Sequence, residues 1–373
     1  MPEVRIDPLS GHRTIVAGER SKRPGGQPTC SPPEPIDAER DPFAEGHEDR
    51  TPPELYAVRP GGGPADSPDW TVRVVPNLYP ALIPADANDA AGVAVRVGTG
   101  VAVRVGTGVE AGAGVEVEAG AGAGVGVGQQ TESTAEPARG KPELFTALPA
   151  TGVHEVIVNG PQSVLSLAEL PVEQVVAAVE VWRARMRAHS DSAYLQLIVN
   201  ERREAGASLP HTHAQLYGLD FVPALVARER ERANAYTTRT MGGSLLGDLL
   251  AEEVRLRERI VAVDEEAVLL APFASQLPFQ LMLVPRRPRA RFEEEGPSGA
   301  ALLHDGLRRL ARLLGSSPPL NLYVRTAPLG AEHFCWRIDV LPRLTHLAGL
   351  ELSTGVNLNI VAPEHAAALL REA

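Results

Sequence analysis

Cysteine is scarce in this sequence, with only Cys30 and Cys335 among 373 residues. Two cysteines exclude a disulfide framework and fit a reducing compartment. Long apolar runs are missing as well, because no segment approaches the roughly 18 apolar residues of a membrane span. The first fifteen residues lack the apolar core of a secretion signal and already include Asp7. We therefore expect a soluble, cytoplasmic protein.

Positive charge is also in deficit, since 36 Lys and Arg stand against 47 Asp and Glu and give a formal net charge of −11. Such a protein has no general attraction for nucleic-acid backbones or anionic membranes. Any phosphate group that it binds must be held in a local pocket. What the chain does have is a globular composition, 43% hydrophobic and 22% charged. Its length allows one large domain or two ordinary ones.

Large side chains are nearly absent from residues 86–139, which are mostly Ala, Gly and Val. This segment contains the sequence VAVRVGTG twice in succession, at 93–100 and 101–108. So little apolar area cannot offset the entropy of an ordered chain. We interpret the segment as a disordered insertion in a loop, and the alternative is a binding arm.

The rest of the chain mixes strands and helices without regular βαβ alternation. Apolar stripes predict helices over 172–186, 245–261 and 300–314. The stripe of the first comprises Val172, Val175, Val176, Val179 and Trp182. Alternation and β-branched content predict strands at 12–16, 70–75, 154–159, 194–200, 211–219, 263–271, 279–285, 320–326 and 334–341. This order favours an α+β fold with antiparallel sheets. Each half holds several strands and a long helix, which is consistent with a duplication, although no sequence repeat marks it.

The sharpest chemical signal is Gly206-Ala-Ser208-Leu-Pro-His211-Thr-His213-Ala-Gln215. Side chains alternate along a strand, so His211, His213 and Gln215 project from one face. An imidazole has a pKa of about 6.5, so its neutral form is available to attack phosphorus. The Gln215 amide can donate to a phosphate oxygen, and Ser208 with the loop N–H groups can hold another. These residue types together indicate phosphate chemistry.

Two other interpretations of the same residues stay open at this point. His-x-His on a strand is a common arrangement of metal ligands. The two histidines are alternatively half-exposed strand residues without a functional role.

Motifs outside residues 86–139 resemble the galactose-1-phosphate uridylyltransferase family, in the transferase branch of the histidine-triad superfamily. That branch has glutamine in the third position of its histidine motif where the hydrolases have histidine, so Gln215 points to a transferase. Further matches follow in the order of the family: RIDPLSGHR at 5–13, GHEDRTPPE at 46–54, VVPNLYPAL at 74–82, GVHEVIV at 152–158, and PR, AGLE and PE at 342–343, 348–351 and 363–364.

This resemblance implies an α+β fold of two histidine-triad-like halves, 1–222 and 223–373, whose antiparallel sheets are flanked by helices. It also implies that His213 attacks the α-phosphorus of UDP-glucose and becomes uridylylated while glucose 1-phosphate leaves. A second hexose 1-phosphate, galactose 1-phosphate in the type reaction, then regenerates His213. Gln215 and Ser208 would steady the phosphoryl oxygens.

The resemblance further supplies substrate-binding candidates and a partner. The candidates are Arg23, Asn77, Asn200, Gly206 and His211. The alternative for Arg23 is a solvated surface arginine, and for Asn77 a turn asparagine. The partners expected are a small nucleotide sugar, a sugar phosphate and a second copy of the chain in a homodimer.

The sequence departs from the family where many members hold zinc through Cys-x-x-Cys, a later histidine and the first histidine of His-x-His. Those four positions read Asp41, Ala44, Ser163 and His211. Because only the last is retained, we expect no zinc site of the family type and no certain cofactor.

A second metal site of some members, built from a glutamate and three histidines, is altered too. Glu229 falls at the glutamate's spacing, while the histidine positions read Arg325, Arg337 and Asp339. We hypothesise that an Arg/Asp salt bridge stands there in place of a metal.

Two alternatives to a UDP-glucose–hexose-1-phosphate uridylyltransferase follow from these departures. One is a nucleotidyltransferase like the ADP-glucose phosphorylases, because the sequence does not resolve the contacts to the base. The other is a non-catalytic nucleotide-sugar binder, which the altered metal positions motivate. The retained Ser208, His213 and Gln215 argue against a binder, which has no need of a nucleophile.

Overall fold

The structure is a computed structural model that describes residues 1–23, 28, 30–84, 144–294 and 296–373. The predicted insertion at 86–139 lies outside these residues. One compact unit comprises Met1–Ile83 and Thr151–Ala373, and a second comprises Pro84–Ala150. Of the second unit, the described residues 144–150 are irregular and exposed.

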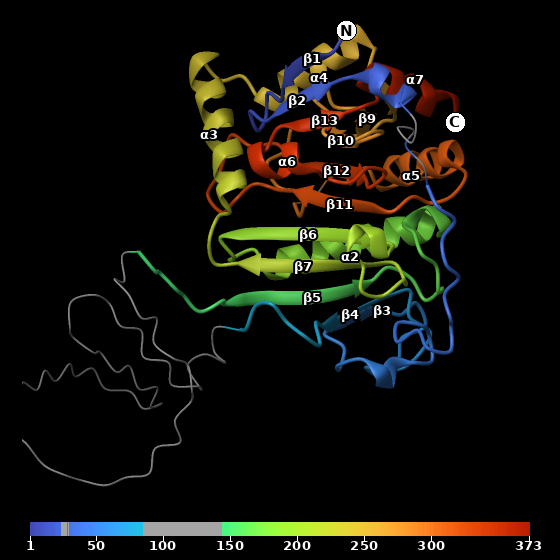
Figure 1. Cartoon of the computed structure of the whole chain (residues 1–373). Helices are drawn as coiled ribbons and strands as arrows, with labels where there is room; N and C mark the ends of the chain where they lie inside the picture. The colour runs from blue at the N-terminus through green and yellow to red at the C-terminus, as the bar shows by residue number, and fades with distance from the viewer. Residues whose placement is uncertain (24–27, 29, 85–143, 295) are drawn as a thin grey trace, which may run out of the picture. The chain divides into compact units, whose positions relative to one another are not determined.

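The larger unit is built on a ten-stranded antiparallel sheet in the order β3-β4-β5-β7-β6-β11-β12-β10-β9-β8 (Figure 1). Its strands are β3 (Tyr56–Val58), β4 (Val72–Pro76), β5 (Gly152–Val158), β6 (Tyr194–Glu201), β7 (His213–Leu219), β8 (Ile260–Val263), β9 (Ala267–Leu270), β10 (Leu281–Pro285), β11 (Leu320–Arg325) and β12 (Arg337–Pro342). A three-stranded sheet joins β1 (Glu3–Ile6), β2 (Arg13–Val16) and β13 (Asn357–Asn359). The predicted α+β class with antiparallel sheets is confirmed.

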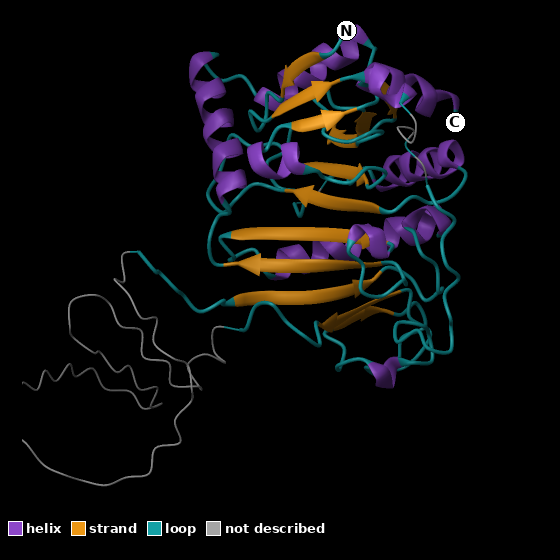
Figure 2. Cartoon of the chain, in the orientation of Figure 1, coloured by secondary structure: helices purple, strands orange, loops and turns teal. Residues whose placement is uncertain are grey.

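Six α-helices occur in the described residues, and they lie between groups of strands along the chain (Figure 2). They are α2 (Val172–Ala188), α3 (Ala224–Arg239), α4 (Leu245–Leu256), α5 (Ala300–Leu314), α6 (Gly349–Thr354) and α7 (Pro363–Glu372). None of these helices combines the length and the apolar character that a bilayer-spanning segment requires.

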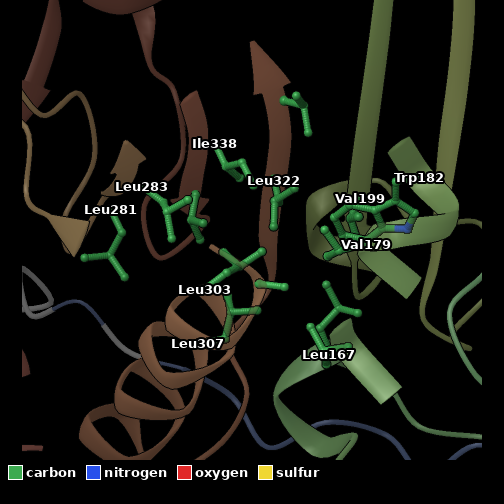
Figure 3. Packing of buried hydrophobic residues seen from close by; sticks show 14 of the residues in the cluster. Leu167, Val179, Trp182, Val199, Leu281, Leu283, Leu303, Leu307, Leu322 and Ile338 are labelled. Carbon is green, nitrogen blue, oxygen red and sulfur yellow. The ribbon is translucent and has the colours of Figure 1, made fainter. Parts of the chain in front are cut away.

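One large apolar core joins α2, α5 and one face of the ten-stranded sheet. Figure 3 shows Val179 and Trp182 of α2 beside Val199 of β6, with Leu303 and Leu307 of α5 beside the strands of the second half. The predicted stripe on α2 is therefore confirmed at Val179 and Trp182. It is wrong at Val176, which is 37% exposed.

The two halves of the chain repeat the same succession of elements. In the first half the succession is β5, α2, β6, β7, and in the second it is β10, α5, β11, β12. In both, the third strand inserts between the other two, giving the orders β5-β7-β6 and β10-β12-β11. The halves join where β6 pairs with β11. Under this correspondence, His213 at the start of β7 matches Arg337 at the start of β12.

Two predicted elements of the second half end earlier or divide. The helix predicted over 245–261 ends at Leu256, because Arg257 adopts a left-handed conformation with φ of 59°. The strand predicted over 263–271 is instead the β8–β9 hairpin, whose turn is held by backbone N–H groups of residues 266 and 267 donating to Asp264. Helix α3 was not predicted, because its buried side chains are only Val226, Glu229 and Ala233.

Glu201, at the end of β6, is a carboxyl group buried away from any cation. Its side chain is 1% exposed and accepts hydrogen bonds from Ser166 Oγ at 2.6 Å and from the Leu167 backbone N–H at 2.7 Å. Burial raises the pKa of Glu201 from 4.5 to about 7, although the two hydrogen bonds oppose that shift. The fold therefore favours the protonated acid.

We expect the variant Glu201→Gln to gain stability relative to the natural protein as pH rises. The stability that protonated Glu201 contributes is complete below the unfolded pKa of about 4.5 and is lost as pH rises through the folded value of about 7. The difference in free energy of unfolding between variant and natural protein should thus shift by about 3 kcal/mol between acidic and mildly alkaline pH. Urea denaturation at a series of pH values measures it, and a difference independent of pH would contradict the assignment.

Candidate active site

Strand β7 carries the predicted chemistry, and its two neighbours in the sheet fix the direction of its side chains. It pairs with β5 on one side and β6 on the other. Ala214 and Leu216 point into the core that α2 covers. Because side chains alternate along a strand, His213 and Gln215 point to the opposite face, toward the cluster of Phe43 and Val156.

On that face lies a cavity of about 390 Å³, within the size range of small-molecule sites. It is bounded by the end of β4 and the loop after it, the loop that precedes the histidine motif, and the segments 42–43 and 50–52. The lining residues are Pro42, Phe43, Arg50, Thr51, Pro52, Val75, Pro76, Asn77, Leu78, Tyr79, Val156, Ser208, Leu209, His213 and Gln215. The cavity thus brings together the three predicted catalytic residues and Asn77.

His213 is held in a single tautomer by a backbone contact. Its Nδ1 lies 2.8 Å from the carbonyl oxygen of His211, which only accepts, so Nδ1 carries the proton. The lone pair of a neutral ring is therefore on Nε2. Burial lowers the pKa of His213, although the bond to the His211 carbonyl opposes that shift. The edge contact of Phe43, with ring centroids 5.2 Å apart, fixes the plane of the imidazole.

Gln215 is oriented by two residues whose roles were not predicted, His154 and Tyr217. The Ala81 backbone N–H donates to His154 Nδ1 at 3.0 Å, so the ring proton of His154 is on Nε2. Gln215 Oε1 accepts from that nitrogen at 3.2 Å and from the Tyr217 hydroxyl at 2.9 Å. With its oxygen engaged twice, the amide NH₂ of Gln215 remains for the cavity. The motif at 152–158 contained His154, but nothing in it indicated a contact with Gln215.

Asn77 shares this cluster through its side-chain amide. Its Oδ1 accepts from the Tyr79 backbone N–H at 2.8 Å, and its Nδ2 lies 3.1 Å from His154 Nε2. Because both of those nitrogens carry hydrogen in this tautomer, the second contact supplies no hydrogen bond. The NH₂ group of Asn77 is then a donor that a ligand in the cavity can use.

His211 lies beneath the cavity rather than in it. Its side chain is 0% exposed, with Nδ1 2.7 Å from Asp41 Oδ2 and Nε2 2.8 Å from the Gly160 carbonyl oxygen. Burial opposes ionisation of Asp41, but hydrogen bonds from His211 and Ser163 outweigh it and lower the pKa of this carboxyl. Both ring nitrogens of His211 are thus bound within the protein and the residue does not line the cavity, so its role as a substrate contact stays a prediction.

The other predicted substrate contacts are not among the residues that line this cavity. Arg23 lines a different cavity, of about 320 Å³, with residues of the second half such as Gln276 and His346. Asn200 accepts from Asn321 Nδ2 at 2.8 Å. Gly206 ends the short helix at 203–205 with φ of 91°, a conformation that favours glycine. Their roles as contacts stay predictions.

The residues at the first altered metal position do not fit a zinc ion. Asp41 and Ser163 already bond to each other at 2.6 Å, His211 has no free nitrogen, and Ala44 brings no donor. Within the described part of the chain, no group of three or more His, Cys, Asp or Glu side chains is placed to hold a metal.

At the second altered position, buried ion pairs bring together helix α3 and strand β12. Arg337 Nη1 and Nη2 lie 3.1 and 3.2 Å from the Glu229 carboxylate, and its Nε lies 2.8 Å from Asp339 Oδ2. The predicted Arg/Asp salt bridge is thus confirmed. Arg325 Nε adds a longer contact of 3.4 Å to Glu229. The Arg337 and Arg325 guanidinium groups hold the pKa of Glu229 below its usual value, although burial opposes them.

Among known proteins, the chain is similar to galactose-1-phosphate uridylyltransferases and to an ADP-glucose phosphorylase. The family model described as galactose-1-phosphate uridyl transferase, N-terminal domain, matches residues 126–223. ADP-glucose phosphorylase of Arabidopsis thaliana is 25% identical over 100% of this chain and 93% of its own length. A probable galactose-1-phosphate uridylyltransferase of Drosophila melanogaster is 27% identical over 61% of this chain and 70% of its own.

Solved structures show the same fold. The crystal structure of an ADP-glucose phosphorylase from Arabidopsis thaliana with bound ADP-glucose has a TM-score of 0.72 at 23% identity, over 100% of this chain and 99% of that chain. A uridylyltransferase structure has a TM-score of 0.64 at 22% identity, over 100% and 98%.

We expect Glu229→Gln to destabilise the protein strongly, because it leaves the buried Arg337 guanidinium with only one of its two carboxylate partners. Breaking one side of a buried ion pair costs about 3–5 kcal/mol. The matched control is Glu252→Gln, which breaks the solvent-exposed Glu252–Arg255 pair and should change the stability far less. Urea denaturation measures both variants, and an equal loss in the two would show that the buried cluster is not needed for stability.

Proposed function

Because the chain belongs to the galactose-1-phosphate uridylyltransferase family, a family of nucleotidyltransferases, we propose that it moves a nucleoside monophosphate through a covalent intermediate on His213. The donor is a nucleoside diphosphate sugar and the acceptor is a phosphate group. The observation that carries this proposal is the state of His213, whose Nδ1 is committed to a carbonyl while the ring lines a ligand-sized cavity. A side chain in that state is a nucleophile at Nε2.

In the first step, Nε2 attacks the α-phosphorus of the donor. A P–N bond forms, the bond from that phosphorus to the bridging oxygen breaks, and the hexose 1-phosphate leaves with the electron pair. In the second step an oxygen of the acceptor phosphate attacks the same phosphorus, the P–N bond breaks, and Nε2 regains its lone pair. Splitting the transfer in this way replaces one difficult step by two easier ones.

The surrounding groups stabilise the charge that moves in each step. As the P–N bond forms, the ring of His213 becomes positive, and the carbonyl of His211 stabilises this charge through Nδ1–H. The free amide NH₂ of Gln215 donates to an oxygen of the α-phosphoryl group, where negative charge accumulates. Ser208, on the exposed loop beside the cavity, is placed to donate to another oxygen.

UDP-glucose with a hexose 1-phosphate as acceptor is the substrate pair that we propose first, from the family motifs. ADP-glucose with inorganic phosphate is the second candidate. It is favoured by the relative that matches along the whole chain, which is named an ADP-glucose phosphorylase. The wall of the cavity that can receive a base contains Phe43, Arg50 and Tyr79. The cytoplasmic location and the homodimer remain predictions, and sedimentation of the purified chain tests the dimer.

Mixing the protein with UDP-glucose, and separately with ADP-glucose, tests both candidates when no acceptor is present. We expect the intact mass to increase by one nucleoside monophosphate with the true donor, and the adduct to be lost in His213→Ala. Hexose 1-phosphate or inorganic phosphate should then discharge it. No adduct from either donor, in a folded protein, would overturn the transferase proposal in favour of a nucleotide-sugar binder.

The rate of adduct formation should depend on pH through His213. Because burial lowers its pKa, the reactive neutral form persists below the ordinary value of 6.5. The rate should therefore be flat through neutral pH and fall only as pH drops through a value below about 6.5. Single-turnover kinetics across this pH range measures the pH at which the rate of adduct formation falls. A fall centred near or above pH 7 would contradict a buried neutral nucleophile.

Tyr217→Phe should hold the Gln215 side chain less firmly while leaving the packing of the site intact. The variant removes one of the two hydrogen bonds to Oε1 but keeps the ring stacked on His154, whose centroid lies 4.1 Å away. We expect adduct formation to slow by about 3- to 10-fold, in keeping with one neutral hydrogen bond. The affinity for the donor should change less than the rate. The matched control is Tyr236→Phe on helix α3, which removes a hydroxyl that donates to Asp248 and does not line the cavity.

A further inference from the structure

We infer that Asp41 is a positioning residue for the nucleophile: its carboxylate clamps the ring of His211 and thereby places the carbonyl that fixes His213. This inference rests on the proposed role of His213, but it names a residue that the family motifs do not supply. Asp41 does not line the cavity and touches no reacting atom. Its effect must pass through the contacts that it makes inside the protein.

The carboxylate of Asp41 accepts three hydrogen bonds. Oδ2 accepts from His211 Nδ1 at 2.7 Å and from Ser163 Oγ at 2.6 Å, and Oδ1 accepts from the Phe43 backbone N–H at 3.0 Å. The side chains of Asp41 and His211 are both 0% exposed, so water does not compete for these bonds. The Gly160 carbonyl accepts from the second nitrogen of His211 at 2.8 Å. The ring of His211 is thus held at both ends.

The position of His211 matters because this residue precedes the strand. The pairing of β7 with β5 begins at His213, opposite Val158. The sheet therefore holds His213 but does not set the carbonyl of His211, to which Nδ1 of His213 donates. That carbonyl belongs to the residue whose ring Asp41 clamps, two positions before the nucleophile.

A second route from Asp41 leads to the same imidazole. By accepting the Phe43 N–H, the carboxylate fixes the loop that carries the Phe43 ring. That ring meets His213 edge-on with centroids 5.2 Å apart and His211 with centroids 6.1 Å apart. The carbonyl acceptor and the apolar wall of His213 therefore both depend on one carboxylate.

Asp41→Asn tests the clamp with little change of shape. A carboxylate accepts all three bonds, whereas a carboxamide brings N–H groups against at least one of the three donors. We expect the single-turnover rate of adduct formation to fall by about 10- to 100-fold, with the donor Kd changed by no more than about twofold. Ser163→Ala, which removes one of the three donors, should have an intermediate effect. Asp37→Asn, an exposed aspartate four residues upstream, is the control.

Nitrogen-15 spectra of the histidine rings supply a readout that does not need activity. In the natural protein we expect His213 to be protonated at Nδ1 but not at Nε2. In Asp41→Asn, His213 should become a mixture of tautomers while the fold, followed by circular dichroism, is kept. A loss of rate with unchanged His213 tautomer and unchanged melting would overturn the clamp.

Two further outcomes would also overturn it. One is a stoichiometric metal in the purified natural protein that Asp41→Asn releases, which would make Asp41 a ligand. The other is a His213 protonated at Nε2 in the natural protein. If the natural protein forms no adduct with either donor, the proposed function fails, but the spectra of the free protein still decide whether Asp41 positions His213.

Discussion

The hydrogen bond from His213 Nδ1 to the His211 carbonyl, 2.8 Å long, is the interaction on which the proposed chemistry of this protein depends. It places the ring proton on the nitrogen that faces the protein and leaves the lone pair on the nitrogen that faces the cavity. Two parts of the fold keep the two residues of this bond in place. The sheet holds one end of the bond through β7, and the loop that contains Asp41 holds the other.

The fold uses one topology twice, with different results. Both halves insert a strand between two others, and that strand begins with His213 in the first half and Arg337 in the second. In the first half, the alternation along the strand sets a nucleophile and an amide donor over a cavity. In the second half, the corresponding residues Arg337 and Asp339 are buried with Glu229 in a charge network. In the proposed reaction the first half supplies the reacting groups, while the corresponding residues of the second half form a buried ion-pair network.

Much of this arrangement could be predicted from local sequence. The spacing of His213 and Gln215 indicated one face of a strand because side-chain alternation is a property of the backbone. The same prediction was wrong for His211, which precedes the strand. Helix α5 was predicted to its last residue, since its apolar stripe runs its full length. The helix expected over 245–261 stopped at Leu256 because Arg257 takes a left-handed conformation that no simple pattern marks. Helix α3 escaped notice because a buried carboxylate, Glu229, stands where an apolar side chain would have signalled a core face.

The contacts that distinguish this site join residues that are far apart in the sequence, and local sequence patterns could not predict them. Asp41 and His211 are 170 residues apart in the sequence. From the sequence, an aspartate at a position where the family has cysteine indicated only the loss of a zinc ligand. Burial decides that the pair is an internal clamp rather than a ligand set. The same holds for His154, which lies opposite Tyr217 on the neighbouring strand and donates to Gln215 from there.

Phosphorus-31 spectra of protein labelled with nitrogen-15 in its histidines, recorded after loading with the donor that forms the adduct, test the central claim most directly. The account predicts a single phosphorus coupled to one nitrogen, Nε2 of His213. Phosphorus coupled to Nδ1 of that ring, or attached to oxygen without any coupling to nitrogen, would contradict it.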